Sequence, residues 1–418
     1  MRTASVPKPA FNHIDVIVIG GGVAGCYTAY RLYQQQADLR VLIIEAADKL
    51  GGRTQTDTFC GVSVTPGAGF GRFDKDALLR RLMKELKFPV SAFNSGHVIS
   101  TAHNSMCHVE ADFKKLRRQY IVDEKASTVP LRVTFKEYAS RRLSDYDGFV
   151  ACTGFSDFEN ADASDVFFHY GFEDNYLSWP AFMVPWSKLI SAMTKKIPYL
   201  LDTCVQKIRR TSSNTFVVTC ADAHTASKWR LRAVKVVITT DVDTLYTLLP
   251  AHRELYKHIH GQPFLKIYGS LDTNSAELLA SALPKTGLVV LPASPLQKIL
   301  RISDTVYLIA YSDNKNALAL RRLSRNDAGS RQILCRLIEL AVHLPANSLR
   351  LRDTRGYFWM TGTHYFDPFA VEPHRSKLQF VEAAQRPEPG VFVAGECVAF
   401  RQGWVEGALE SVENILNS

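Results

Sequence analysis

Three glycines and one acid near the start of the chain have the types and spacing of a phosphate- and ribose-binding site. Gly20, Gly22 and Gly25 fill the glycine positions of a G-x-G-x-x-G pattern, and Glu45 follows about twenty residues later. The first glycine permits a tight turn, the second lets a pyrophosphate approach the backbone, and the third lets a helix pack close to a strand. An acid at the end of the next strand accepts hydrogen bonds from a ribose diol. These residues therefore predict binding of a dinucleotide.

The segments around these residues have the hydrophobic patterns of the elements that must hold them. Residues 16–19 form an apolar β-branched run typical of a central parallel strand, residues 23–36 have helical spacing, and residues 40–44 form a second strand. The predicted helix begins at the glycines, so its free N–H groups and its positive dipole end face the phosphates.

Similar patterns return in two later parts of the chain. Strand-like runs occupy 204–208, 215–219 and 233–240, and an apolar strand that starts at Val391 is followed by a terminal helix that opens near Gly403. We therefore expect an α/β fold with a Rossmann-type domain made of residues 12–85, 198–255 and 385–418. Residues 86–197 and 256–384 mix helical patterns (186–197, 331–344) with strand-like runs (306–312), which predicts a discontinuous second domain of mixed α+β type that binds the substrate.

Composition narrows the possible partners. The 418 residues carry a formal net charge of +9, but basic runs such as Lys114–Arg118 are short and dispersed. This distribution favours a solvated basic surface, and no nucleic-acid partner is expected.

Targeting and metal-binding signals are missing from the sequence. No apolar run is long enough to span a membrane, and Met1–His13 lacks an apolar signal core, so we expect a soluble cytoplasmic protein. The 8 cysteines are scattered without a C-x-x-C pair. That scatter favours reduced thiols over a disulfide framework, and no metal site is predicted.

The motifs at the two ends of the chain resemble those of the flavin-containing amine oxidases, which include monoamine, polyamine and L-amino-acid oxidases. The resemblance lies in the glycine fingerprint, the Gly51-Gly52-Arg53 triplet, the Gly67-Ala68 turn, the Ala394-Gly395-Glu396 strand end and the run from Gly403 to Ala408. It implies an FAD-binding domain and oxidation of a carbon–nitrogen bond.

The resemblance also assigns cofactor contacts. Gly52 and Arg53 stand where the family contacts the pyrophosphate, and a guanidinium presents paired donors to phosphate oxygens. Val205 resembles the position whose backbone meets the adenine. Gly395, Glu396, Trp404 and Val405 lie where the family holds the ribityl chain and the flavin ring. Thr363 replaces the cysteine that links flavin covalently in monoamine oxidases, so noncovalent FAD is expected.

Candidate catalytic residues follow from the same resemblance. Lys266 matches the family's lysine, which holds a water beside the reactive flavin nitrogen and assists the reaction with molecular oxygen. Trp404 matches one aromatic wall of the substrate cage. Aligning Gly362 with the family's glycine puts His364 or Tyr365 at the second wall.

Two departures leave the substrate open. Polyamine oxidases carry an acid shortly after the Gly67-Ala68 turn, whereas this chain has Arg72, which could clamp a substrate carboxylate as in L-amino-acid oxidases. The family's glycine pair near Lys188 is also missing. The expected function is FAD-dependent oxidation of an amine to an imine, with oxygen as the acceptor and hydrogen peroxide as a product. The alternatives are an L-amino-acid oxidase and a flavoprotein that uses FAD structurally or as a redox sensor.

Overall fold

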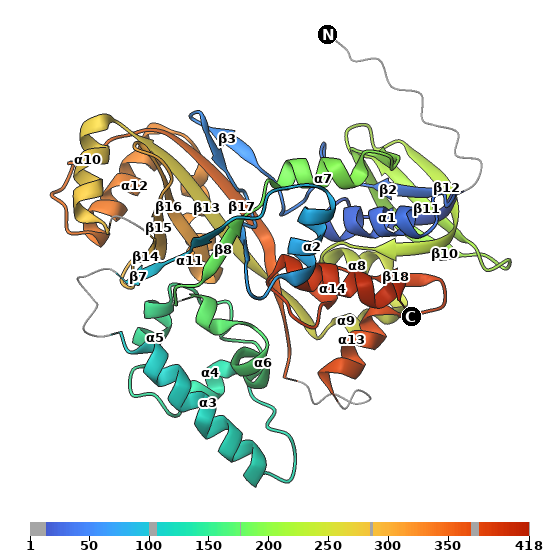
Figure 1. Cartoon of the computed structure of the whole chain (residues 1–418), viewed down its shortest axis with the longest axis horizontal. Coiled ribbons are helices and arrows are strands. Elements are labelled where there is room, and N and C mark those ends of the chain that lie inside the picture. The colour runs from blue at the N-terminus through green and yellow to red at the C-terminus, as the bar shows by residue number, and fades with distance from the viewer. Residues whose placement is uncertain (1–13, 100–106, 176, 285–286, 369–375, 418) are drawn as a thin grey trace.

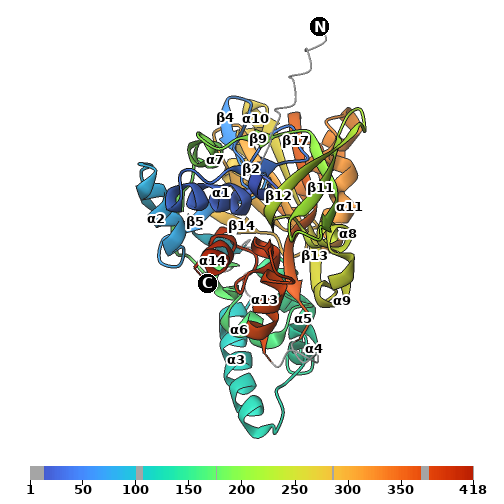
Figure 2. The same cartoon turned by 90° about the vertical axis from the view of Figure 1, so that its right-hand side faces the viewer.

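A computed structural model describes residues 14–99, 107–175, 177–284, 287–368 and 376–417. The segment Met1–His13, where the absence of a signal core was predicted, lies outside the described residues. Figure 1 shows two sheet-containing parts side by side and a lobe of helices below them, and Figure 2 shows the same lobe after a quarter turn.

A seven-stranded sheet forms the core of the first part. Its order is β10-β11-β12-β1-β2-β9, and β18 also pairs with β12. The pairs β12–β1, β1–β2, β2–β9 and β12–β18 are parallel, while β10–β11 and β11–β12 are antiparallel. The strands are β1 (Ile14–Ile19), β2 (Val41–Ile44), β9 (Tyr199–Leu200), β10 (Thr203–Arg210), β11 (Phe216–Asp222), β12 (Lys228–Ile238) and β18 (Val391–Val393). Parallel strands from distant parts of the chain thus meet in one sheet, as the α/β prediction requires.

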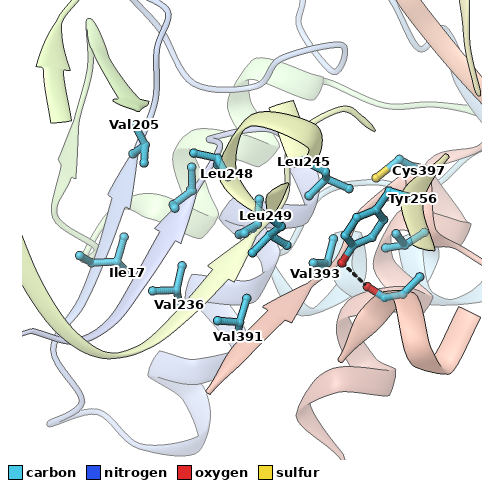
Figure 3. Packing of buried hydrophobic residues seen from close by; sticks show 14 of the residues in the cluster. Ile17, Val205, Val236, Leu245, Leu248, Leu249, Tyr256, Val391, Val393 and Cys397 are labelled. Carbon is cyan, nitrogen blue, oxygen red and sulfur yellow. Dashed lines mark hydrogen bonds between the residues drawn. The ribbon is translucent and has the colours of Figure 1, made fainter. Parts of the chain in front are cut away.

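Branched side chains from these strands fill the core on one face of the sheet. Ile17, Val236 and Val391 are fully buried there, together with Leu245 of helix α8 (Val242–Leu248) (Figure 3). Burying each such side chain contributes roughly 1.5–3 kcal/mol. Tyr256, the last residue of α9 (Arg253–Tyr256), satisfies its buried hydroxyl by donating to the carbonyl of Ala384 at the end of α13 (Lys377–Gln385).

Helices α1 (Val23–Gln35), α7 (Trp186–Thr194) and α14 (Val405–Leu416) pack together in the core on the opposite face. Helix α2 (Ala77–Glu85) lies beside α14, where the buried carboxylate of Glu406 accepts hydrogen bonds from the backbone of Leu78 and Leu79. Helix α7 therefore packs with the seven-stranded sheet although its residues fall in the range 86–197 that was assigned to the second domain.

A six-stranded sheet with order β17-β13-β16-β15-β14-β7 forms the second part. Its long strands β13, β16 and β17 are antiparallel, and α10, α11 and α12 accompany it. The bounds are β7 (His97–Ile99), β13 (Ile259–Leu271), β14 (Leu288–Val290), β15 (Lys298–Arg301), β16 (Val306–Asp313), β17 (Leu351–Phe366), α10 (Thr273–Ala282), α11 (Asn314–Leu320) and α12 (Ala328–Ala341). Short strands β3 (Asp57–Phe59) and β4 (Val62–Val64) form a hairpin, and β5 (Phe70–Arg72), β8 (Pro180–Met183) and β6 (Ala92–Asn94) form a small sheet.

The helical lobe consists of α3 (Val109–Ala126), α4 (Phe135–Ser140), α5 (Tyr146–Thr153) and α6 (Ala163–Phe168) around a core rich in phenylalanine. A disulfide joins Cys107, just before α3, to Cys152 in α5. The expectation of reduced thiols was therefore wrong for this pair. The two cysteines are 45 positions apart, so the approach of α3 and α5 that joins them has no local signature.

Within the described part of the chain, every helix is too short or too polar to cross a bilayer.

Candidate active site

The glycine fingerprint lies where the carboxyl end of β1 meets the start of α1. A Cβ at Gly25 would come within 1.9 Å of the carbonyl oxygen of Gly20, so only glycine permits this helix–strand approach. A Cβ at Gly22 would meet nothing within 4 Å, and α1 begins there without a side-chain cap. Open space thus faces uncapped N–H groups at the helix start, and this arrangement fits a pyrophosphate.

Glu45 lies directly after β2, beside the glycine fingerprint. Its Oε2 accepts a hydrogen bond from the Gly21 N–H at 2.6 Å, and its Oε1 accepts one from Ala47 at 2.8 Å. A carboxylate has about four acceptor positions, so these bonds leave room for ribose hydroxyls. The Glu45 carbonyl accepts from the Thr203 N–H at 2.9 Å, which brings the start of β10, where buried Val205 lies, close to Glu45.

The loop that carries Gly52 and Arg53 lies against the fingerprint. The Gly51 N–H donates to the Gly21 carbonyl at 2.8 Å, and a Cβ at Gly52 would approach the Gly22 Cα to 3.4 Å. Arg53 donates from Nη1 to the Gly362 carbonyl at 2.7 Å and to Glu396 Oε2 at 2.9 Å. Both bonds use one nitrogen, so Nε and Nη2 remain as donors for a phosphate.

The C-terminal motif reaches the same place from the end of β18. A Cβ at Gly395 would lie 3.8 Å from the Cβ of Ala24 in the first turn of α1. The Gly395 N–H donates to Ser411 Oγ at 2.7 Å, which ties this turn to α14, and Val405 begins that helix. The motifs from both ends of the chain therefore surround one helix start.

Glu396 is the centre of a buried charge network. Its carboxylate accepts from the His364 Nδ1 at 2.6 Å, from the backbone N–H of His364 and Gly403 at 2.9 Å each, and from Arg53. Burial raises the pKa of the Glu396 carboxyl, but the charges of His364 and Arg53 outweigh this effect and hold the pKa well below its usual range. Glu396 is therefore anionic at neutral pH and fixes the side chains around it.

The two candidates for the second cage wall have different surroundings. The imidazole of His364 is fully buried, with Nδ1 on Glu396 and with Nε2 lacking a hydrogen-bond partner within the described residues. Tyr365 is half-buried, stacks on His260 with ring centroids 5.0 Å apart and packs against the helical lobe. His364 thus belongs to the Glu396 network, and Tyr365 lies where the six-stranded sheet meets the lobe.

Lys266 lies in the middle of β13 and is 5% exposed. Its Nζ donates to the Gly67 carbonyl at 2.6 Å and, more weakly, to the carbonyl and hydroxyl oxygens of Thr65 at 3.3 and 3.4 Å. Burial lowers the pKa of Lys266 to about 7. The lysine therefore sits where the six-stranded sheet meets the Gly67-Ala68 turn, with a charge that is easily lost.

Trp404 precedes α14, and Arg72 lies on it. The guanidinium carbon of Arg72 is 3.8 Å from the centroid of the Trp404 ring. Arg72 is buried and donates to Asp76 from Nε and Nη2, at 2.9 and 2.7 Å, and to Asp174 from Nη1 at 3.1 Å. With its nitrogens directed to two carboxylates of the chain, Arg72 is arranged to position Trp404, and this geometry does not favour a clamp for a substrate carboxylate.

One buried polar cluster was absent from the sequence predictions. Asp157, Lys298 and Asp313 are each at most 5% exposed, and Tyr170 donates to Asp157 Oδ1 at 2.6 Å. These residues belong to no motif and lie far apart in the chain, so the sequence carries no signal that would have joined them.

The fold combines a Rossmann-like parallel sheet with a separate antiparallel sheet, and Arg53 beside the glycine fingerprint bonds to Gly362 in β17 of the second sheet. The model of the family described as flavin-containing amine oxidoreductase matches residues 23–413, which is most of the chain. The chain therefore belongs to the flavin-containing amine oxidoreductase family.

Similarity to individual proteins is broad in structure and narrow in sequence. A solved structure of wild-type putrescine oxidase bound to putrescine superposes with a TM-score of 0.70 at 16% identity, covering 96% of this chain and 98% of that one. This likeness shows the shared fold. The FAD-dependent oxidoreductase dpasF of Apiospora sacchari is 30% identical over 103 residues, and the nicotine dehydrogenase of Pseudomonas putida is 40% identical over 67 residues. These matches cover 24% and 16% of this chain and only 21% and 13% of the two relatives.

Proposed function

We propose that the protein is an FAD-dependent oxidase that converts an amine to an imine by oxidising its carbon–nitrogen bond, with molecular oxygen as the acceptor. The observation that carries this proposal is Lys266, a buried amine held by Gly67 and Thr65 on a turn that contacts the Arg53 loop, where the Ala68 N–H donates to the Arg53 carbonyl at 2.9 Å. A buried lysine is costly unless it has acceptors, and the oxygens of Gly67 and Thr65 supply them, so Lys266 is held in place as a hydrogen-bond donor at this junction.

The chain's residues fit FAD. The pyrophosphate would be held at the start of α1 by Gly20, Gly22 and Gly25, together with Gly52 and Arg53. The carboxylate of Glu45 would bind the ribose, and Val205 would lie beside the adenine. Gly395, Glu396, Trp404 and Val405 would hold the ribityl chain and the flavin ring. Thr363 offers no thiol, so we propose noncovalent binding. When bound, FAD supplies the hydride acceptor and passes the electrons to oxygen, which yields hydrogen peroxide.

Lys266 would hold a water molecule next to the flavin. A pKa of about 7 leaves part of the Lys266 population protonated at neutral pH, so the residue can donate a hydrogen bond and place positive charge where oxygen is reduced.

We propose as the substrate a neutral amine held between Trp404 and the segment of His364 and Tyr365. Arg72 holds Trp404 in place, while His364 is kept in the Glu396 network. An aromatic enclosure disfavours the ammonium form, and the amine must lose its proton because the nitrogen lone pair drives departure of the hydride. The ion pairs of Arg72 with Asp76 and Asp174 weigh against an L-amino-acid substrate.

Anaerobic mixing of the purified, FAD-loaded protein with amines, polyamines and amino acids tests the proposal. Bleaching of the flavin's visible absorbance by an amine, but not by its α-carboxylated parent, is expected. Bleaching only by amino acids would replace the proposal with L-amino-acid oxidation. Flavin that no donor reduces would favour a flavoprotein that uses FAD structurally or as a redox sensor.

A further inference from the structure

The polar cluster at the end of β16 is an unusual feature of the substrate domain. Lys298, the first residue of β15, is 0% exposed, and its Nζ lies 3.6 Å from the centroid of the Phe155 ring. Asp313, the last residue of β16, is also 0% exposed, and Asp157 is 5% exposed. Two acids and one base are thus buried together, which is costly unless the charges compensate one another.

Hydrogen bonds hold Asp157 against the sheet with little freedom. The neighbouring Ser156 donates to Asp313 from its backbone at 2.6 Å and from its hydroxyl at 3.1 Å. The carbonyl of Asp157 accepts from Gln262 Nε2 at 2.7 Å. The Asp157 carboxylate is therefore held in a fixed place by its own backbone and by its neighbour.

Tyr170 connects this carboxylate to the predicted substrate cage. Its hydroxyl donates to Asp157 Oδ1 at 2.6 Å. At the other side, the Tyr170 ring lies 3.9 Å from the position of a Cβ on Gly403, the residue before Trp404. A Cβ on the next residue, Gly171, would be 3.3 Å from Nη1 of Arg72, which stacks on Trp404. A path of contacts thus runs from the cage wall through Tyr170 to Asp157.

We propose that Tyr170 and Asp157 remove the proton from the substrate's ammonium group before the carbon–nitrogen bond is oxidised. This inference rests on the proposed function. The ammonium N–H bond breaks and its proton passes to the Tyr170 oxygen, while the Tyr170 hydroxyl proton passes to the Asp157 carboxylate. The products are a neutral amine, a neutral tyrosine and a protonated Asp157, and no electrons move in this step. A phenol group both donates and accepts hydrogen bonds, as this relay requires.

The charges around Asp157 suit a base that works near neutral pH. Burial and the neighbouring carboxylate of Asp313 raise the pKa of Asp157 well above its usual range, while the Tyr170 hydroxyl and the charge of Lys298 lower it in part. Tyr311 also faces the group, and burial followed by the charge of Asp157 raises the pKa of the Tyr311 phenol well above its usual range. A general base is most effective when its pKa lies near the pH at which the enzyme works.

Tyr170→Phe and Asp157→Asn are the test variants, and Tyr146→Phe is a matched control. Tyr146 donates to Glu159 at 3.1 Å in the same lobe, so its loss removes a similar hydrogen bond away from the cage. The rate of anaerobic flavin reduction is measured from pH 6.5 to 10 with the best amine donor. We expect the two variants to be slower by about 10²-fold at pH 7 and to approach the wild-type rate near pH 10, where the amine loses its proton unaided.

A purely structural role for the pair would slow the reaction equally at every pH. A uniform loss, or a wild-type profile in Tyr170→Phe, would overturn the inference. Flavin content and melting temperature identify a variant that has lost its fold, and either variant alone suffices for the test.

Proton release gives a second measurement that needs no turnover. The probe is tert-butylamine, which has no α-hydrogen and cannot be oxidised, and its binding is followed by calorimetry at pH 8.5 in buffers of different ionisation enthalpy. The wild type is expected to release about zero protons because ionised Asp157 takes up the ammonium proton, whereas Asp157→Asn should release about one. A wild type that binds the probe and releases one proton would overturn the inference and leave the proposed function intact. A wild type that neither binds the probe nor is reduced by any amine would overturn both.

Discussion

Two buried lysines in one sheet, Lys266 on β13 and Lys298 on β15, have the same titration behaviour and different surroundings. Burial lowers the pKa of each amine to about 7. The amine of Lys266 donates to the Gly67 and Thr65 carbonyls, whereas the amine of Lys298 has no hydrogen-bond acceptor among the described residues. Both amines lie over an aromatic ring, Lys266 at 4.7 Å from the Tyr311 centroid and Lys298 at 3.6 Å from that of Phe155, but only for Lys298 do the negative charges of Asp157 and Asp313 raise the pKa against the effect of burial.

The difference teaches that burial sets how readily such a lysine loses its proton, while the neighbours decide what the lysine can do. Lys266 has its main acceptor on the Gly67 turn, which bonds to the Arg53 loop of the proposed FAD site, so it can orient a small polar molecule there. Lys298 interacts with Asp157 and Asp313 through its charge, so it can lower the pKa of the Asp157 carboxyl.

The largest effect is expected at Arg72, a third buried cation, which is satisfied by full ion pairs. Arg72→Met would leave buried Asp76 without its arginine partner and would leave Asp174 with Lys75 at 2.5 Å, and we expect the free energy of unfolding in urea to fall by about 3–5 kcal/mol. Arg81→Met, at an exposed arginine whose Nη2 lies 3.4 Å from Glu413, should change it by less than about 1 kcal/mol. Equal stability of the two variants would show that Arg72 gains nothing from its ion pairs.

The next largest effect is expected on the reaction of reduced flavin with oxygen when Lys266 is replaced. Lys266→Met should slow reoxidation of the reduced flavin by oxygen about 10²-fold, because a positioned donor is lost, and should change flavin reduction by less than about 3-fold. Stopped-flow measurement of both half-reactions checks this, with Lys235→Met, at an exposed lysine of β12, as the control. Equal slowing of both half-reactions would remove the oxygen-related role.

The comparison also explains what the sequence predicts well. Elements β1, α1 and α14 were predicted because their glycine spacing and hydrophobic periods are local, and the structure has them at Ile14–Ile19, Val23–Gln35 and Val405–Leu416. The partner of His364, in contrast, is Glu396 on another element, and Lys298 meets Asp157 only through a loop from the helical lobe. Such long-range pairings depend on the tertiary fold, which has no local signature, and the disulfide of Cys107 with Cys152 was missed for the same reason.

Stability against pH tests whether both lysines are neutral in the folded protein. The pKa of each is about 7 when folded and about 10.4 when unfolded, so between these values only the unfolded state binds the proton, and the free energy of unfolding rises with pH. Each lysine should contribute about 1.4 kcal/mol per pH unit above pH 7. Urea unfolding at pH 7.5 and 8.5, with FAD in fixed excess, should show a smaller rise in Lys266→Met and in Lys298→Met than in the wild type. An unchanged slope in either variant would mean that this lysine is charged in the folded state.

The smallest expected effect is a shift in the pH profile of flavin reduction when the buried charge of Lys298 is removed, compared with removal of an exposed lysine. Removing this cation takes away an influence that lowers the pKa of Asp157, so Lys298→Met should shift the pH at which flavin reduction reaches half its maximal rate upward by about one unit. Lys315→Met removes the same charge from an exposed position on α11 and should leave the profile in place, because solvent screens that charge. A profile that stays fixed in Lys298→Met would mean that Lys298 is already neutral when Asp157 titrates. The pKa of Asp157 would then be set by burial, by the charge of Asp313 and by the hydrogen bond from Tyr170, with no contribution from Lys298.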